Sequence, residues 1–282
     1  MDKLKRSKSY PFVLLGVTIA GIALGIWLIF SVIVPAVRSI FGGDQQEALP
    51  TPTPVEMVDL TDKIEEILLT STSKNVSKPS VVGDTVIFAS GGDTGKGAQM
   101  TGITLYDRLA DKSEKIEGIS LQNDNILTMA ANANYIVYID SINSGGGSLY
   151  CYNRQTAELK ELKKIDYGYP EIKICGDYAV WTERTGQVTE KLYMMNLVSE
   201  ELTTLEVFED SPMGLSQAGV AADEIVWSAP DPERPENNNY SILKILSLDT
   251  GEITEYRPDM YVYNPVTNGE ARAWTDANGR CV

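Results

Sequence analysis

The pattern of apolar and polar positions divides the chain into two unlike parts. Residues 12–34 form one almost uninterrupted apolar run, whereas short apolar stretches alternate with turn residues beyond residue 55. The long run predicts a membrane-spanning helix, because about 20 apolar residues are needed to cross the hydrocarbon core of a bilayer. The short stretches predict β-strands. We therefore expect an all-β domain that is preceded by one transmembrane helix.

The residues around the apolar run predict its orientation in the membrane. Four basic residues precede it, namely Lys3, Lys5, Arg6 and Lys8, and no charged residue occurs in 11–37. Such an excess of basic residues favours the cytoplasmic side. We expect an uncleaved signal-anchor in a plasma membrane, with the N-terminus in the cytoplasm and the later domain outside. A cleaved signal peptide is the alternative, although its apolar region typically has only about 7–15 residues.

The segment after the apolar run is a spacer. Pro50, Pro52 and Pro54 alternate with threonine, and such a sequence favours an extended, semi-rigid chain. The predicted domains are a cytoplasmic tail (1–10), a signal-anchor helix (11–37), a Pro/Thr linker (38–54) and an extracytoplasmic β-propeller (55–282).

The β-propeller is predicted from a repeat in the later part of the chain. Five segments share a small residue, then usually a polar residue, then an apolar run that ends on an aromatic: 83–88, 133–138, 176–181, 222–227 and 269–274. They start 43 to 50 residues apart, a period typical of propeller blades. We expect each repeat segment to place its polar residues in a hairpin turn and its apolar run at the end of a central strand. Trp181, Trp227 and Trp274 are then predicted to be core residues.

A second pattern follows the first four repeat segments. Apolar stretches at 103–108, 148–153, 191–196 and 242–247 predict the third strand of each blade. The polar turn 249–252 then leads to a short predicted outer strand, 253–256.

These repeats resemble those of TolB-like and related bacterial surface-type β-propellers. The similarity is carried by a Gly-Asp-Tyr-x-Val-Trp type of strand, a strand that contains Leu-Tyr, and the Asp-Thr-Gly-Glu turn at 249–252. It covers residues 55–282 and implies a propeller of four-stranded blades. The resemblance implies no shared catalytic motif.

The five repeat segments favour five blades, with the last blade shared between the two ends of the chain. Its inner strands are expected within 263–275 and its outer strands within 55–69, which closes the ring and covers exposed strand edges. A helix over 61–69 and a fragment of a larger propeller are the alternatives.

Composition restricts the chemistry. The chain has no histidine, which excludes nucleophiles activated by histidine and metal sites that need imidazole. Cys151, Cys175 and Cys281 have no CxxC spacing, so we expect buried apolar strand residues, with a disulfide as the alternative. We predict no catalytic residues, no metal and no cofactor. The net charge of −15 disfavours nucleic acid as a partner.

Candidate binding residues lie just before the predicted inner strands of two blades. Tyr167, Tyr169, Tyr261 and Tyr263 stand there beside prolines, together with Glu171. Aromatic side chains at the rim of the central channel would suit peptides or sugars. The alternative is that they are ordinary half-buried loop tyrosines.

Two classes of function follow. The first is a non-catalytic binding or scaffold module on the bacterial cell surface that presents its loop face to a protein, peptide or glycan. The second is a propeller-type glycoside-active enzyme, which would need two carboxylates at the channel mouth. Glu171 and Asp124 are its candidate pair.

Overall fold

The computed structural model describes residues 75–92, 99–119, 121–209, 217–234, 240–258 and 260–276. All of them belong to one compact unit, Leu69–Val282. No helix in this described part of the chain is long and apolar enough to cross a membrane. The predicted signal-anchor and linker lie outside the described residues.

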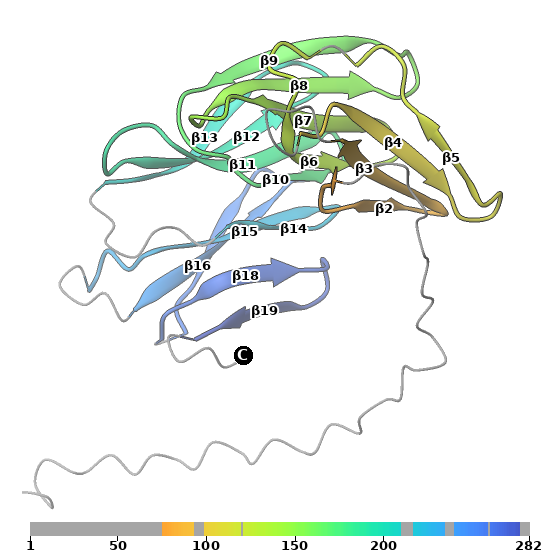
Figure 1. Ribbon diagram of the computed structural model, residues 1–282. Helices are drawn as coiled ribbons and strands as arrows, with labels where there is room; N and C mark the ends of the chain where they lie inside the picture. The colour runs from red at the N-terminus through yellow and green to blue at the C-terminus, as the bar shows by residue number, and fades with distance from the viewer. Residues whose placement is uncertain are drawn as a thin grey trace, which may run out of the picture. The chain divides into compact units, whose positions relative to one another are not determined.

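The described residues fold into antiparallel sheets, which we number in chain order (Figure 1). The first contains β1 (Asn75–Val76), β2 (Ser80–Val82), β3 (Thr85–Gly91), β4 (Gly102–Asp107) and β5 (Lys112–Lys115). The second contains β6 (Ile126–Ala131), β7 (Tyr135–Ser141), β8 (Gly147–Asn153) and β9 (Leu159–Ile165). The third contains β10 (Ile172–Cys175), β11 (Tyr178–Arg184), β12 (Glu190–Asn196) and β13 (Leu202–Phe208).

The remaining strands form two further sheets. The fourth contains β14 (Gly219–Val220), β15 (Glu224–Pro230), β16 (Ser241–Ser247) and β17 (Ile253–Tyr256). The fifth has two described strands, β18 (Tyr263–Thr267) and β19 (Arg272–Thr275). The second, third and fourth sheets each run first, second, third, fourth strand in spatial order, as propeller blades do. In the first sheet, β1 and β2 both pair with β3 and share the place of the first strand.

The repeat segments supply the second strand of every sheet, with one correction to the sequence-based expectation. Each apolar run begins this strand rather than ends it, because the polar turn comes before the run in the chain. In the third sheet the turn at Gly176 and Asp177 joins β10 to β11, and Gly176 has a φ of 52°. Glycine adopts this left-handed conformation without the steric cost that a Cβ brings.

The predicted third strands are β4, β8, β12 and β16, and the predicted outer strand 253–256 is β17. The turns after them share one construction. A polar side chain at the end of the third strand accepts backbone hydrogen bonds from the turn, as Asn153 Oδ1 does from Gln155 and Thr156, at 2.9 and 3.1 Å. Asp107, Asn196 and Ser247 take the same part in the other three turns.

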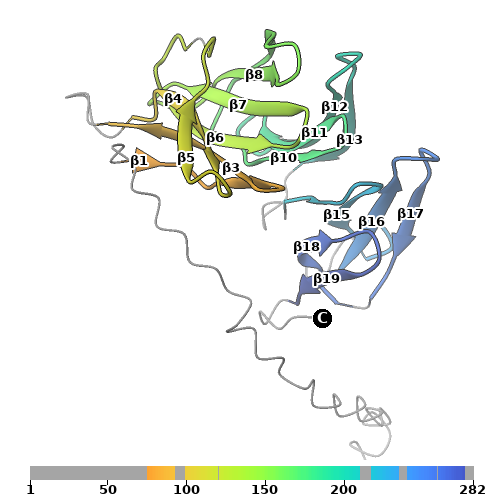
Figure 2. The ribbon, with the colours of Figure 1, turned by 90° about the vertical axis from the view of Figure 1, so that its right-hand side faces the viewer.

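The core lies between successive sheets. Ile87 and Ala89 of the first sheet pack with Ile136 and Tyr138 of the second, and similar clusters join second to third and third to fourth. Val226 and Leu243 of the fourth sheet pack with Val262, and Trp274 of the fifth packs against them. Each sheet therefore covers a face of the next, as Figures 1 and 2 show.

Trp181 and Trp227 are fully buried, as predicted, whereas Trp274 is partly buried. The two buried indoles donate to carboxylates at the junctions between sheets. Trp181 Nε1 lies 3.3 Å from Glu183 Oε2, and Trp227 Nε1 lies 3.1 Å from Glu206 Oε2. Each carboxylate also binds a lysine of a neighbouring sheet, at 2.8 and 2.5 Å. These paired charges satisfy polar atoms that would be costly to bury alone.

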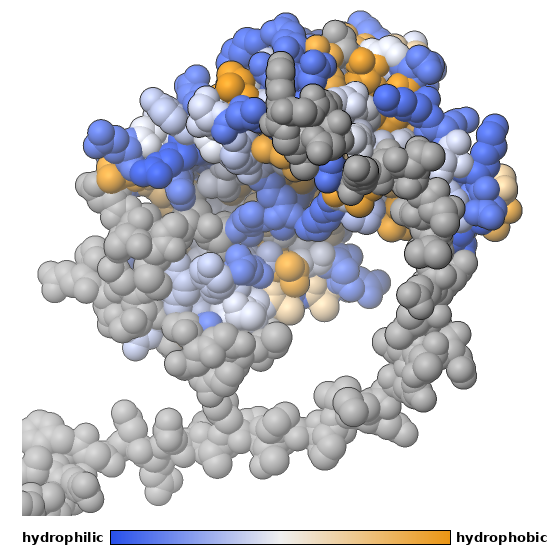
Figure 3. Space-filling model, viewed as in Figure 1, coloured by the Kyte–Doolittle hydropathy of each residue, from blue (hydrophilic) through white to orange (hydrophobic). Residues whose placement is uncertain are grey.

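The cysteine prediction is confirmed where the structure describes it. Cys151 and Cys175 are buried free thiols, and burial raises the pKa of each to about 11. Cys281 lies outside the described residues, and so does the segment 55–69 that is expected to complete the last blade. Hydrophilic side chains cover most of the described surface in the view of Figure 3.

The shared turn allows a test of backbone strain. Ala157 and Gly251 hold equivalent turn positions, with φ of 57° and 72°, and a Cβ on Gly251 would meet open space. We expect Ala157→Gly to raise the free energy of unfolding by about 0.5 kcal/mol and Gly251→Ala to lower it by about 1 kcal/mol. Chemical denaturation measures both. Equal effects of the two changes would contradict this account of the turn.

Candidate functional site

A cavity of about 460 Å³ lies where the first strands of four sheets come together. We call it the channel cavity. Its walls come from the β1–β2 connection, from β6, from β10 and the residues before it, and from β14. The lining includes Lys78, Leu127, Met129, Tyr169, Glu171 and Lys173.

Local sequence explains how two of these side chains reach the cavity. Pro79 has no N–H to donate, so the pairing with β3 is interrupted between β1 and β2 and Lys78 lies in the break. The hydroxyl of Ser77 stabilises the break by accepting a hydrogen bond of 2.9 Å from the Ala89 amide. A bulge in β6 leaves Leu127 unpaired, between Ile126 and Thr128, and Leu127 lines the cavity.

An ion pair joins the first and third sheets at the cavity. Lys78 Nζ lies 2.6 Å from Glu171 Oε1. Burial by itself would raise the pKa of Glu171. The hydrogen bond from Lys78 and the charges of Lys78 and Lys173 outweigh burial, so the pKa is lowered and Glu171 stays ionised. Glu171 is therefore an ionised carboxylate whose charge is balanced by Lys78.

Lys173 is the second cation of the cavity. It lies on β10 between Ile172 and Ile174, and its backbone pairs with Val180 of β11. Burial lowers the pKa of Lys173, while Glu171 opposes the change and Lys78 adds to it. Within the described part of the chain, no carboxylate lies within salt-bridge distance of its ammonium group. The cavity lining thus carries one cation that is not balanced by an ion pair.

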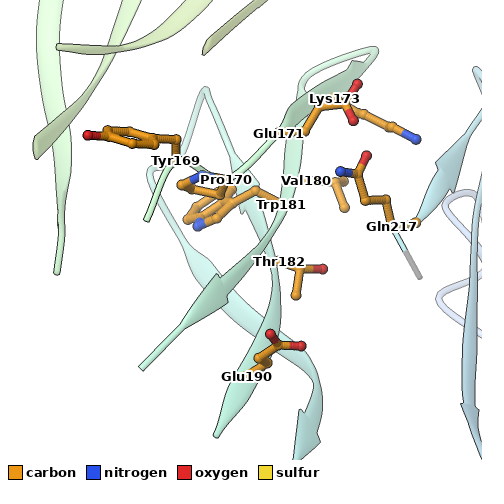
Figure 4. Close-up of a pocket in the computed structure, with 10 residues that line it drawn as sticks. Tyr169, Pro170, Glu171, Lys173, Val180, Trp181, Thr182, Glu190 and Gln217 are labelled. Carbon is orange, nitrogen blue, oxygen red and sulfur yellow. The ribbon is translucent and has the colours of Figure 1, made fainter. Parts of the chain in front are cut away.

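A smaller pocket of about 190 Å³ adjoins the channel cavity and shares Tyr169, Glu171 and Lys173 with it. We call this smaller pocket the side pocket. Figure 4 shows that Glu171, Lys173 and Gln217 lie together at one end of it. Glu190 lies at the other end. The two lysines and Glu171 therefore mark the polar part of one continuous site.

Exposed apolar side chains lie beside the channel cavity. Leu127, Ile142, Tyr167 and Tyr169 are between 37% and 57% exposed, and we call them the rim patch. Tyr169 Oη donates to the carbonyl oxygens of Ile142 and Asn143, at 2.9 and 3.0 Å, and so ties two loops together. Both loops lie on the side where each sheet is entered, which we call the loop face.

The structure brings together only some of the predicted binding residues. Tyr169 and Glu171 line the channel cavity, whereas Tyr167 is exposed and is not among its described lining residues. Tyr261 and Tyr263 lie at the start of the fifth sheet, with ring centroids 6.2 Å apart, and line neither of these two cavities. Binding by any of these residues stays a prediction.

Sequence reasoning missed Lys78 and Lys173. A lysine between two isoleucines in a short inner strand was a signal for Lys173, because a charge is unexpected in such a strand. Nothing in the sequence relates Lys78 to Glu171, which is 93 residues away. In the part of the chain that the structure describes, no three acidic or cysteine side chains come together in a way that could hold a metal ion.

No protein-family model matches the sequence, and no curated protein matches it either. Solved structures do match. The β-propeller domain of the Trilobed protease from Pyrococcus furiosus has a TM-score of 0.48 and 14% identity, over 68% of this chain and 61% of that one. A nidogen/laminin complex has a TM-score of 0.43 and 12% identity, over 72% of each chain.

TolB from Acinetobacter baumannii has a TM-score of 0.43 and 15% identity, over 73% of this chain and 53% of that one. The chain thus spans less than two thirds of the length of the Trilobed protease domain and of TolB. At these identities the likeness concerns the arrangement of strands and says nothing about activity.

Because Lys173 is partly desolvated, its replacement by an uncharged side chain should stabilise the protein. We expect Lys173→Met to raise the free energy of unfolding at pH 7 by about 0.5 kcal/mol, a small value because water screens a partly exposed charge. The pKa of Lys173 is lowered in the folded state, so the charged ammonium group destabilises the fold at pH values below that pKa. The gain should shrink as pH rises toward the ordinary lysine value of about 10.4.

Thermal and chemical unfolding across pH 7 to 10.5 measure this difference. Lys112→Met is the matched control, because Lys112 is exposed on the outer strand β5 and should change stability little. A loss of stability in Lys173→Met that exceeds the control would contradict the prediction.

Proposed function

We propose that the chain is a membrane-anchored, extracytoplasmic β-propeller that binds a protein or peptide partner at its loop face without catalysing a reaction. The anchor is the apolar segment 11–37, and its orientation rests on the basic residues before it. A glycan remains the other ligand class that an aromatic rim suits.

The observation that carries this proposal is the rim patch beside the channel cavity. Apolar and aromatic side chains around a concave site are typical of binding surfaces, and loops on a rigid sheet scaffold are the usual place for them. Tyr169 is held by two hydrogen bonds, so a partner would meet a largely pre-organised ring. Hydrophilic side chains are prominent on the face that Figure 3 shows, which suits a domain exposed to water.

The glycoside-active alternative is less well supported by the same residues. Its acid must stay protonated near neutral pH, which requires a raised pKa. Glu171 has a lowered pKa and is bound to Lys78. Asp124 is exposed and does not line the channel cavity. Glu190 shares the side pocket with Glu171, and it is the carboxylate that would have to serve as the partner.

The partner prediction can be tested with a photo-crosslinking side chain. Placed at Tyr167 in the full chain in its own membrane, it should give discrete crosslinked products. The matched control is Val198, which is 65% exposed in the turn after β12, on the opposite side from the loop face. Tyr167→Ser should weaken retention of the captured partner by about tenfold, as loss of an aromatic anchor does. Equal products at both sites would contradict a loop-face site.

We also propose that the propeller has five blades and that the segment 55–69 supplies the missing outer strands of the fifth sheet. β19 pairs with β18 on one side, and no described strand pairs with its other edge. Trp274 Nε1 is buried and has no hydrogen-bond partner in the described part of the chain, whereas Trp181 and Trp227 each donate to a carboxylate. An added strand would complete the sheet and supply the missing cover.

Hydrogen exchange of the full chain tests this closure. Val58→Pro removes an amide that a strand would use and should break the added strand. We expect faster exchange at residues 272–275 in this variant and unchanged exchange in the second and third sheets. Leu49→Pro, in the spacer, is the control. If the amides of β19 exchange equally fast in the unaltered chain and in Val58→Pro, the shared blade is wrong.

A further inference from the structure

The channel cavity has a charge that no ion pair among the described residues balances. Lys78 and Glu171 neutralise each other at 2.6 Å, whereas Lys173 has no ion-pair partner among the described residues. The chain as a whole carries a net charge of −15, so a cation set apart in a cavity is unusual for this surface. A partly desolvated ammonium group costs free energy unless an anion approaches it.

We propose that Lys173 binds a carboxylate group of the peptide or protein partner, so that the ligand supplies the missing anion of the channel cavity. This inference rests on the proposed function, because it assumes that the loop face binds such a partner. It assigns the chemical class of the bound group, which the rim patch does not.

The lining favours a carboxylate over a phosphate group. Phosphate sites usually combine several donors, such as arginine forks or backbone amides at a helix start. Among the described lining residues, the channel cavity offers one ammonium without an ion pair and no arginine. One cation with few other donors suits a single negative charge.

The rest of the lining suits the apolar part of a peptide. Leu127, Met129 and Ile172 line the same cavity, and Tyr169 stands at its rim. A volume of about 460 Å³ falls within the usual range for small-ligand sites and holds a few side chains at most. The expected ligand is therefore a short apolar segment with a carboxylate, either a free C-terminus or an acidic side chain.

Glu171 has a positioning part in this site. Its ion pair with Lys78 spans the cavity from the third sheet to the first and occupies Lys78. Glu171 also shares the side pocket with Gln217, whose side chain lies on the same side as Lys173 in Figure 4. An incoming carboxylate would thus find in Lys173 an ammonium group that has no ion pair among the described residues, whereas Lys78 is already paired with Glu171.

Nuclear magnetic resonance of the full chain in detergent micelles, with ¹³C-methylated lysines, tests the inference directly. The probes are N-acetyl-Leu-Phe with a free carboxylate, N-acetyl-Leu-Phe-amide, and N-acetyl-Glu-Leu-Phe-amide. We expect a saturable shift of the Lys173 signal with the acid, and binding of the C-terminal amide weaker by about tenfold or more. A shift with the third probe would assign the site to an acidic side chain as well.

Variants keep the test decisive. Lys173→Met, which should fold stably, is expected to lose the preference for the acid, and Lys173→Arg should retain most of it. Lys112→Met should behave as the unaltered chain. Equal affinity for acid and amide, no shift at Lys173 with either carboxylate probe, or an acid preference that survives Lys173→Met would each overturn the inference.

The result is distinguishable from failure of the proposed function. Crosslinking at Tyr167 that persists in Lys173→Met, together with no response to the acid probes, would leave a loop-face binding module and remove the carboxylate site. Acid binding at Lys173 without crosslinking at Tyr167 would support the carboxylate site and contradict a partner at the loop face.

Discussion

The constraint on which this structure depends is that each sheet has two faces and covers neither by itself. In β7 every residue is buried, and in β15 all but the last are, because a neighbouring sheet packs on each side. Apolar burial of this kind supplies most of the driving force for folding. The outer strands β5 and β17 are exposed throughout, so they add hydrogen bonds and solubility more than core. Successive packing then brings the first strands of the sheets together around the channel cavity.

The fold could be predicted because each repeat combines a turn residue with an apolar run, and both can be recognised in the sequence. A turn that starts with glycine, as at Gly176, needs a residue that tolerates positive φ, and the apolar run after it must be buried on both faces. The glycine turn recurs at Gly83 and Gly269, whereas two repeats start with Ala133 and Ala222, and the apolar run recurs most clearly in the first four repeats. The sequence-based prediction put the apolar run at the end of the strand. The run lies at the beginning, because the turn precedes the run in the chain. Outer strands such as β5 were not predicted individually, because four exposed residues carry no apolar pattern.

The candidate site could be predicted only in part, for a different reason. Tyr169 and Glu171 were identified because they stand just before an inner strand, which is a position that the repeat itself defines. Lys78 was not identified, because its ion pair with Glu171 depends on the distance between two sheets across the cavity. Leu127 depends on a bulge, and a one-residue bulge leaves no mark in the apolar pattern of β6. Repeats encode what the sheets share, whereas a site is built from what differs between them.

The different lengths of the inner and outer strands explain why a cavity is tolerated between the sheets. The first strands β1, β2, β10 and β14 have two to four residues each and β6 has six, whereas the second strands have seven in four of the sheets. Most ladder hydrogen bonds therefore lie away from the cavity, and so does the buried indole of Trp227, whereas Trp181 lines the side pocket. Polar contacts such as Glu183 with Lys163 also join sheets at the outer strands. Because most of the packing lies there, an inner strand can carry a partly desolvated charge such as Lys173 without loss of the fold. In the site that we propose, a ligand that neutralises this charge would remove its free-energy cost.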